Sequence, residues 1–72
     1  MVDTQKLKGK IAEKGFNQRK LAKILGISET SMYTKMRTGA FGINEMTVLV
    51  DTLGLSDSDI IAIFFADGDT LK

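Results

Sequence analysis

The stretch that most constrains the fold is residues 18–38, QRKLAKILGISETSMYTKMRT. Its first half carries apolar residues at the spacing of one helix face: Leu21, Ile24 and Leu25. Gly26 follows where a helix must end, because a residue without a Cβ enters the left-handed conformation at little cost. Ser28 then offers the side-chain oxygen of an N-cap. The stretch therefore predicts two short helices joined by a tight turn.

The second of these helices has an apolar and a polar side. Met32 and Met36 lie one turn apart, so we expect both to face the core. The remaining side chains are expected to point to solvent: Glu29, Thr30, Tyr33, Thr34 and Arg37. Threonine offers a hydroxyl and a methyl group for base edges, and glutamate can accept from the cytosine amino group. This polar row is a candidate surface for reading DNA.

The pattern Gln-x-x-Leu-Ala-x-x-Leu-Gly-Ile-Ser, which begins at Gln18, resembles the helix-turn-helix of the small phage repressor and Cro-like family. A small phage-regulator branch of it, which includes modulators of repression, or antirepressors, is resembled by the order Met32-Tyr33-x-Lys35-Met36, then Phe41, Ile43 and Asn44-Glu45-Met46, and finally Ile63-Phe64-Phe65-Ala66. The resemblance covers the chain from about Leu7 to Ala66. It implies an all-α fold, a compact bundle of about five short helices with a central helix-turn-helix, as in lambda-repressor-like DNA-binding domains.

In that family the second helix of the motif lies in the major groove, and the residue matching Gln18 helps to bind a phosphate. The resemblance and the polar row together give the candidate DNA-binding residues: Gln18, Arg19, Lys20, Ser28, Glu29, Thr30, Tyr33, Thr34, Lys35 and Arg37. One position departs from the family pattern, because Lys35 stands where many members carry an aliphatic residue. The apolar side chain comes at Met36 instead, which indicates a slight rotation of this helix.

The charge is divided between the two halves of the chain, although the net charge is only +1. Residues 1–38 hold nine of the ten basic residues against three acids, a net charge of +6. Residues 39–72 hold one base against six acids, a net charge of −5. This asymmetry suggests a basic face for phosphate and an acidic face for another partner, although both could be solvated surfaces.

The composition excludes several classes of function. The chain has no cysteine and no histidine, so the usual metal ligands and the commonest general base are missing. We therefore expect no enzyme, no cofactor, no metal and no small-molecule substrate. No apolar run approaches a membrane span, and no signal peptide is recognisable. The expected location is the cytoplasm, which the resemblance places in a bacterial host.

The other helices are predicted from their end signals. Asp3 or Thr4 can cap a first helix that runs to about Lys14. Asn17 can cap the second, and Asn44 a fourth that is stopped by Gly54. Ser56-x-x-Asp59 is typical of a capping box for a fifth helix. We expect one domain over residues 1–66, followed by a polar tail over 67–72.

Residues 60–65, IIAIFF, are apolar on all sides. The run could form a helix or a short strand, because it is short and rich in β-branched and aromatic residues. In either case part of it should be exposed, and exposed apolar patches often mark interfaces. The candidate interface residues are Ile60, Ile61, Ile63, Phe64 and Phe65, with a well-packed terminal helix as the alternative.

Two functions are compatible with these features. The first is a sequence-specific transcriptional regulator of Cro or repressor type, acting as a homodimer on double-stranded DNA in a lysis–lysogeny-like switch. The second is an antirepressor that binds the main phage repressor protein and alters its DNA binding. The low net charge, the acid at Glu29 and the acidic, apolar second half of the chain favour the second function.

Overall fold

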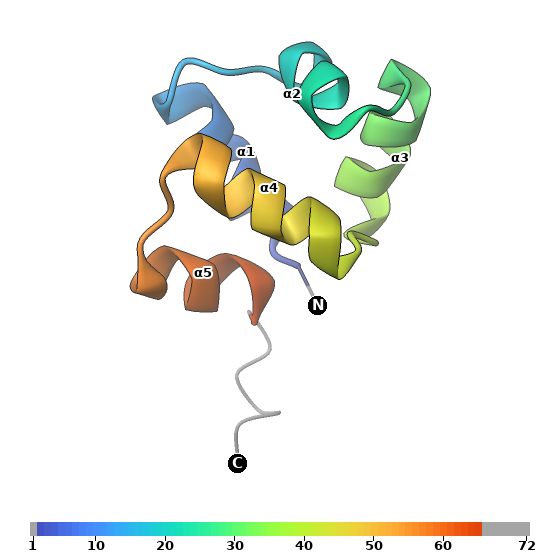
Figure 1. Cartoon of the computed structure of the whole chain (residues 1–72). Helices are drawn as coiled ribbons and strands as arrows, with labels where there is room; N and C mark the ends of the chain where they lie inside the picture. The colour runs from blue at the N-terminus through green and yellow to red at the C-terminus, as the bar shows by residue number, and fades with distance from the viewer. Residues whose placement is uncertain (1, 66–72) are drawn as a thin grey trace.

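The computed structural model describes residues 2–65, which form five helices and no strand (Figure 1). The helices are α1 (Thr4–Glu13), α2 (Gln18–Leu25), α3 (Glu29–Thr38), α4 (Ile43–Leu53) and α5 (Asp57–Phe64). The expected all-α bundle of short helices is confirmed. The apolar run that could have been helix or strand is helical as far as Phe64. The predicted polar tail, residues 67–72, lies outside the described residues.

Side-chain caps explain where most of these helices begin. A side-chain oxygen accepts the backbone N–H three residues later at four helix starts in residues 2–65: Asp3, Asn17, Ser28 and Ser56. The Asn17 bond to the Lys20 N–H is 2.8 Å long. At Ser56 the bond is reciprocal, because the Asp59 carboxylate accepts the Ser56 N–H at 3.1 Å. The predicted capping box is therefore confirmed.

Helix α4 begins differently from the prediction. Gly42, rather than Asn44, occupies its N-cap position, and Asn44 lies in the first turn. The Glu45 carboxylate accepts the Gly42 N–H at 2.9 Å, and Lys35 Nζ lies 3.1 Å from the same oxygen. A glutamate that reaches back to the cap therefore replaces the side-chain cap that was expected. The Gly42 N–H, and next Lys35, hold the pKa of Glu45 below its usual value.

The core is built from apolar side chains of all five helices and two connecting segments. Its buried members are Leu7, Ile11, Leu21, Ala22, Met32, Met36, Phe41, Leu49, Leu53, Leu55, Ile63 and Phe64. Met32 and Met36 are 0% and 1% exposed, so their predicted core position is confirmed. Ile24 is 46% exposed, so the apolar face predicted for α2 buries Leu21 but not Ile24.

Helix α5 is held against α1. The Asp3 N–H donates to the Ile63 carbonyl at 2.7 Å, and Lys10 Nζ lies 3.4 Å from Asp59 Oδ1. Helix α4 crosses the front of the bundle, with α2 and α3 above it and α5 below it (Figure 1). This arrangement places α2–α3 and α5 at opposite ends of the molecule. None of the described helices is long and apolar enough to cross a membrane.

Candidate nucleic-acid interface

The turn between α2 and α3 is fixed by backbone bonds and one hydroxyl. Gly26 adopts a φ of 72°, in the left-handed region. The Ile27 N–H donates to the Ala22 carbonyl at 3.0 Å, which closes the end of α2. The Ser28 hydroxyl accepts the Ser31 N–H at 3.0 Å and starts α3. Helices α2 and α3 then pack against each other, and the predicted pair of short helices joined by a tight turn is confirmed.

Helix α3 presents the expected polar row to solvent. Thr30, Tyr33, Thr34 and Arg37 are all exposed, with 64% of Tyr33 accessible. Because Met32 and Met36 anchor the opposite side, this row cannot rotate into the core. The row therefore provides hydroxyl, methyl, phenol and guanidinium groups on one side of one helix.

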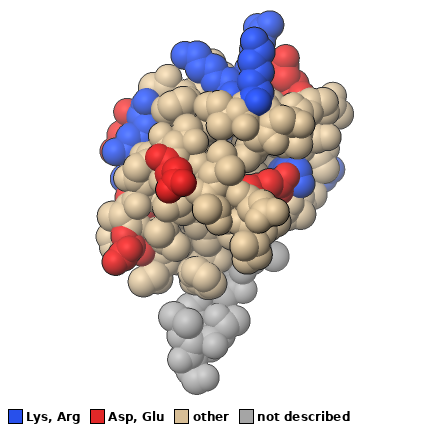
Figure 2. Space-filling model, in the orientation of Figure 1, with Lys and Arg blue, Asp and Glu red and all other residues tan. Residues whose placement is uncertain are grey.

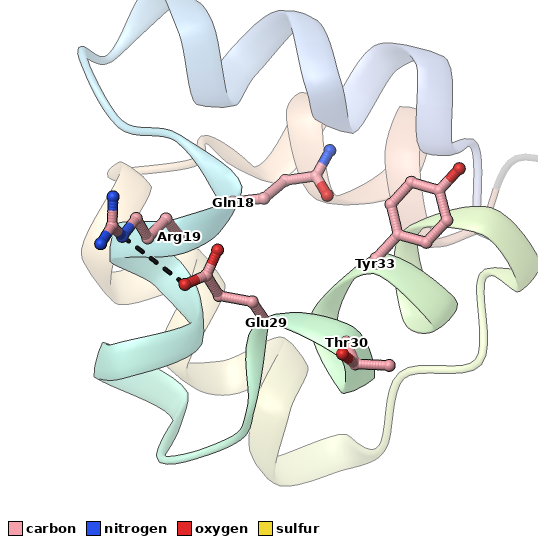
Figure 3. Close-up of a pocket in the computed structure, with 5 residues that line it drawn as sticks. All are labelled: Gln18, Arg19, Glu29, Thr30 and Tyr33. Carbon is pink, nitrogen blue, oxygen red and sulfur yellow. Dashed lines mark ion pairs between the residues drawn. The ribbon is translucent and has the colours of Figure 1, made fainter.

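The structure adds a hollow between the first turns of α2 and α3. It has a volume of about 320 Å³ and is lined by Gln18, Arg19, Glu29, Thr30 and Tyr33. Figure 3 shows Gln18 and Tyr33 extending over the space from opposite helices, with Thr30 below them. All five residues were candidates from the sequence, but their arrangement around one hollow was not predicted. It depends on the angle between the helices, which no local pattern encodes.

An ion pair lies at the edge of this hollow. Arg19 Nε is 3.5 Å from Glu29 Oε2, and both side chains are largely exposed, at 74% and 68% (Figure 3). Such an exposed pair contributes only about 0–1 kcal/mol to stability. Its consequence is electrostatic, because Glu29 neutralises one of the cations closest to the polar row. The sequence indicated both charges but not their proximity.

Two of the candidate DNA-binding residues, Lys35 and Ser28, make contacts with other residues of the chain. Lys35 is half-buried, with its ammonium group on Glu45 and 3.5 Å from the Ala40 carbonyl, so it points toward the start of α4. The Ser28 hydroxyl accepts the Ser31 N–H and also donates to the Ser31 hydroxyl at 3.1 Å. Both residues therefore stabilise helix ends, and the ammonium group of Lys35 is held at Glu45.

A second, polar depression lies along the other edge of α3 and was missed from the sequence. It is lined by Thr30, Ser31, Thr34, Lys35, Thr38 and Ala40. The Thr38 hydroxyl donates to the Thr34 carbonyl at 2.9 Å and accepts the Ala40 N–H at 3.3 Å. Ser31 and Thr38 thus extend the hydroxyl-rich surface on this side of the polar row. Ser31 and Thr38 are seven positions apart, about two helical turns, and this spacing could have indicated that they share one side of α3.

The cations next to the polar row come mainly from α2. Arg19, Lys20 and Lys23 are exposed there, and Arg37 is exposed near the end of α3. In Figure 2 basic side chains project from the top of the molecule, where α2 lies, and others lie at its left and right edges, while the middle of this face is mostly neutral with scattered acids. Exposed cations therefore lie on α2 and at the end of α3, the same two helices that carry the hollow and the polar row.

The predicted interface residues of α5 divide into two groups. Ile63 and Phe64 are 1% and 6% exposed, so they belong to the core, which corrects their assignment as exposed interface residues. Helix packing causes this, because they lie on the side of α5 that faces α1 and α4. Ile60 is half-buried, whereas Ile61 and Phe65 are 53% and 51% exposed.

Residues 2–65 form a small all-α bundle in which α2 and α3 are joined by a tight turn. Residues 1–67 match the model of a family described as "Protein of unknown function (DUF739)", and the chain belongs to that family. Searches of curated proteins and of solved structures gave no match. Within residues 2–65, no group of three or more His, Cys, Asp or Glu side chains could hold a metal ion.

Proposed function

We propose that the chain is a transcriptional regulator that binds double-stranded DNA through α2 and α3, with α3 in the major groove. The observation that carries this proposal is the polar, exposed row of α3 beside the exposed cations of α2. A helix of this width fits the major groove, where each base pair presents a distinct pattern of donors and acceptors. Cations next to that helix can neutralise phosphates and set its register.

The residues divide into positioning and reading roles. Gln18 lies in the first turn of α2, where backbone N–H groups without a helical acceptor favour a phosphate. Lys20 is an exposed phosphate contact in this proposal. Thr30 and Thr34 read base edges, and Arg37 contacts the backbone near the end of α3. Tyr33, beside the hollow, contacts the sugar–phosphate backbone through its hydroxyl.

The regulatory mechanism in this proposal is occlusion of a promoter. Domains with a helix-turn-helix commonly bind as dimers to two half-sites about 34–36 Å apart. A homodimer of this chain would place two copies of α3 in successive major grooves on one side of the DNA. In a phage-type switch, occupancy of such a site would exclude polymerase from one of two opposing promoters.

Fluorescence anisotropy with the DNA upstream of the protein's own gene tests the proposal. The titration is performed at two salt concentrations and in the presence of random competitor DNA. We expect competitor-resistant binding that weakens as salt rises, because phosphate neutralisation releases counterions. Binding that random DNA abolishes would contradict sequence-specific recognition.

Two variants separate the roles. Thr34→Ala should weaken the specific site by about 1–3 kcal/mol with little effect on random DNA. Lys20→Ala should weaken both and reduce the salt slope by about 1. Thr47→Ala, an exposed threonine of α4 that bonds its own helix, is the matched control and should bind as the unmodified protein does. Equal losses on both DNAs for Thr34→Ala would remove its reading role.

A second candidate function is favoured by the Arg19–Glu29 pair. This acid reduces the positive charge at the polar row, which suits contact with a protein as well as with DNA. The chain would then act as an antirepressor that binds the main phage repressor. Adding the purified neighbouring repressor to the anisotropy assay tests this. Release of the repressor from its operator supports the second function, whereas unchanged repressor binding at micromolar concentrations contradicts it.

A further inference from the structure

An apolar groove lies between α4 and α5, far from the polar row of α3. It has a volume of about 260 Å³. Its apolar walls are Ile43, Met46 and Val50 from the α4 side and Ile60, Phe64 and Phe65 from the α5 side. Thr47 and Asp51 complete its lining. We refer to it as the α4–α5 groove.

Two of the side chains that line the groove are largely exposed. Ile43 is 75% exposed and Phe65 is 51% exposed. Ile61, which belongs to α5 but is not part of the lining, is 53% exposed. None of these three side chains belongs to the buried core, which in this part of the chain includes Leu49, Leu53 and Ile63. Apolar surface left around a concave site usually marks a binding surface.

The charges around this groove have one sign. Residues 41–65 contain four acids and no lysine or arginine. Two of the acids are neutralised from other helices, Glu45 by Lys35 and Asp59 by Lys10. Asp51, which lines the groove, and Asp57, at the start of α5, are exposed and have no ion-pair partner among the described residues. The middle and lower left of the face in Figure 2 carry acids without basic side chains, which lie at the top and at the two edges.

These charges argue against a second copy of the chain as the occupant. A two-fold contact uses the same surface of both copies, with residue i of one meeting residue j of the other. It would therefore bring two acidic surfaces together, without a compensating cation from residues 41–65. The groove is also short, because its two helices have 11 and 8 residues, which correspond to lengths of about 16 Å and 12 Å.

We propose that the α4–α5 groove binds an amphipathic helix of a partner protein, with an apolar ridge flanked by lysine or arginine. The length of the groove matches about three turns of helix. Its apolar walls would receive residues at i, i+3 or i+4, and i+7 of that helix. Asp51 and Asp57 would attract the basic flanks, which gives orientation and rate as well as affinity. This contact does not require DNA binding by α3, although it could provide the surface for the antirepressor function.

The probe for this proposal is a fluorescein-labelled peptide of about 18 residues, long enough to be partly helical in water. Leucines form one face, alanines the other, and lysines flank the leucines. A second peptide replaces each lysine by glutamate. Anisotropy with the full chain should show binding of the lysine peptide, and binding of the glutamate peptide at least about tenfold weaker. Equal binding of the two peptides, or no binding of either, would overturn the proposal.

Matched variants locate the site. Asp51→Lys reverses a groove charge, and Ile43→Ser removes the most exposed apolar wall, and both positions are outside the core. Each should weaken the lysine peptide by about threefold or more. Glu29→Lys and Ile24→Ser make the same exchanges on α3 and α2 and should leave its affinity unchanged. Equal losses in the two pairs would place the peptide elsewhere and reject the groove.

The oligomeric state tests whether a second copy of the chain occupies the groove. Light scattering after gel filtration should give the same mass for the unmodified chain and for Ile43→Ser over a wide range of protein concentration. A dimer that Ile43→Ser dissociates would assign the groove to a second copy and overturn the proposal. The DNA titration is separate, so failure of either proposal leaves the other measurable: Asp51→Lys should not weaken DNA binding, and Thr34→Ala should not weaken peptide binding.

Discussion

The pairs α2–α3 and α4–α5 are built on the same turn. Each turn reads glycine, aliphatic residue, serine: 26–28 in the first and 54–56 in the second. Gly26 and Gly54 have φ values of 72° and 62°. In both turns the aliphatic residue donates its N–H to a carbonyl five residues earlier, at 3.0 Å and 3.1 Å. In both, the serine caps the following helix.

The two pairs differ in what the second helix packs against. Helix α3 packs against its neighbour α2, whereas α5 packs against α1 and α4 packs against α2. In the first pair the two helices therefore pack on each other, and α3 exposes its polar row. In the second pair each helix packs mainly on a helix outside the pair, and the α4–α5 groove lies between the two. A shared local turn thus fixes the ends of two helices but not the surface that they present.

The largest expected effect compares one methionine from each pair. Met32→Ala in α3 removes a side chain that is 0% exposed and should lower the free energy of unfolding by about 2–5 kcal/mol. Met46→Ala in α4 shortens a half-buried wall of the groove and should cost about 1 kcal/mol. Urea unfolding followed by circular dichroism measures both. Similar losses would mean that the groove wall is as tightly packed as the core.

The turns themselves should respond alike to substitution. Gly26→Ala and Gly54→Ala each force an L-residue into a left-handed conformation and should cost about 1–2 kcal/mol. A Cβ at either position meets no atom within 4 Å, so backbone conformation is the whole effect. Thermal unfolding of the two variants should give nearly equal shifts. A clear difference would show that one turn is held by tertiary contacts as well.

Acid should weaken the contact between Lys35 of α3 and Glu45 of α4, which connects the two pairs. The Gly42 N–H and Lys35 hold the pKa of Glu45 below its ordinary value of 4.5, so its ionised form is the one that the fold stabilises. The stabilisation is complete above that value and is lost as the pH falls through the lower, folded-state pKa. Glu45→Gln should therefore reduce stability at neutral pH and flatten its decline in acid.

The control for this titration is Asp51→Asn, an exposed acid of the same helix outside the described ion pairs. Urea unfolding at a series of pH values should give this variant the acid dependence of the unmodified protein. The same steep decline for Glu45→Gln would contradict the role of Glu45 at the start of α4.

The smallest expected effect lies outside both pairs and has the opposite sign. Gly9 is exposed in the middle of α1, and a Cβ there meets no atom within 4 Å. Gly9→Ala should raise the free energy of unfolding by up to about 1 kcal/mol, because alanine loses less backbone entropy in a helix. Its thermal midpoint should rise, in contrast to the two turn variants. A decrease would mean that α1 needs the freedom of a glycine.

Most helix boundaries were predictable because their signals are local. Asp3, Asn17, Ser28 and Ser56 each bond a backbone group three residues away, so a few residues of sequence suffice. The start of α4 was not, because Glu45 replaces a side-chain cap and is supported by Lys35 from another helix. Residues near the start of α4 therefore do not reveal this cap, because Lys35 belongs to α3.

The candidate site was predicted as residues but not as a surface. The spacing of Met32 and Met36 was enough to define the polar row of α3, because helical geometry fixes which side chains share a side. The pairing of Lys35 with Glu45 and the pairing of Arg19 with Glu29 depend on distances between helices. For the same reason Ile63 and Phe64 could not be separated from Ile61 and Phe65 in an apolar run.

By itself the sequence determined most of the helices and their caps, the left-handed turns and the buried methionines, because each follows from interactions within a few residues. Only the tertiary structure decided which charges meet, which of the α5 side chains are buried, and that a groove separates α4 from α5. These outcomes depend on how whole helices pack, and the two similar turns of this chain lead to different packing.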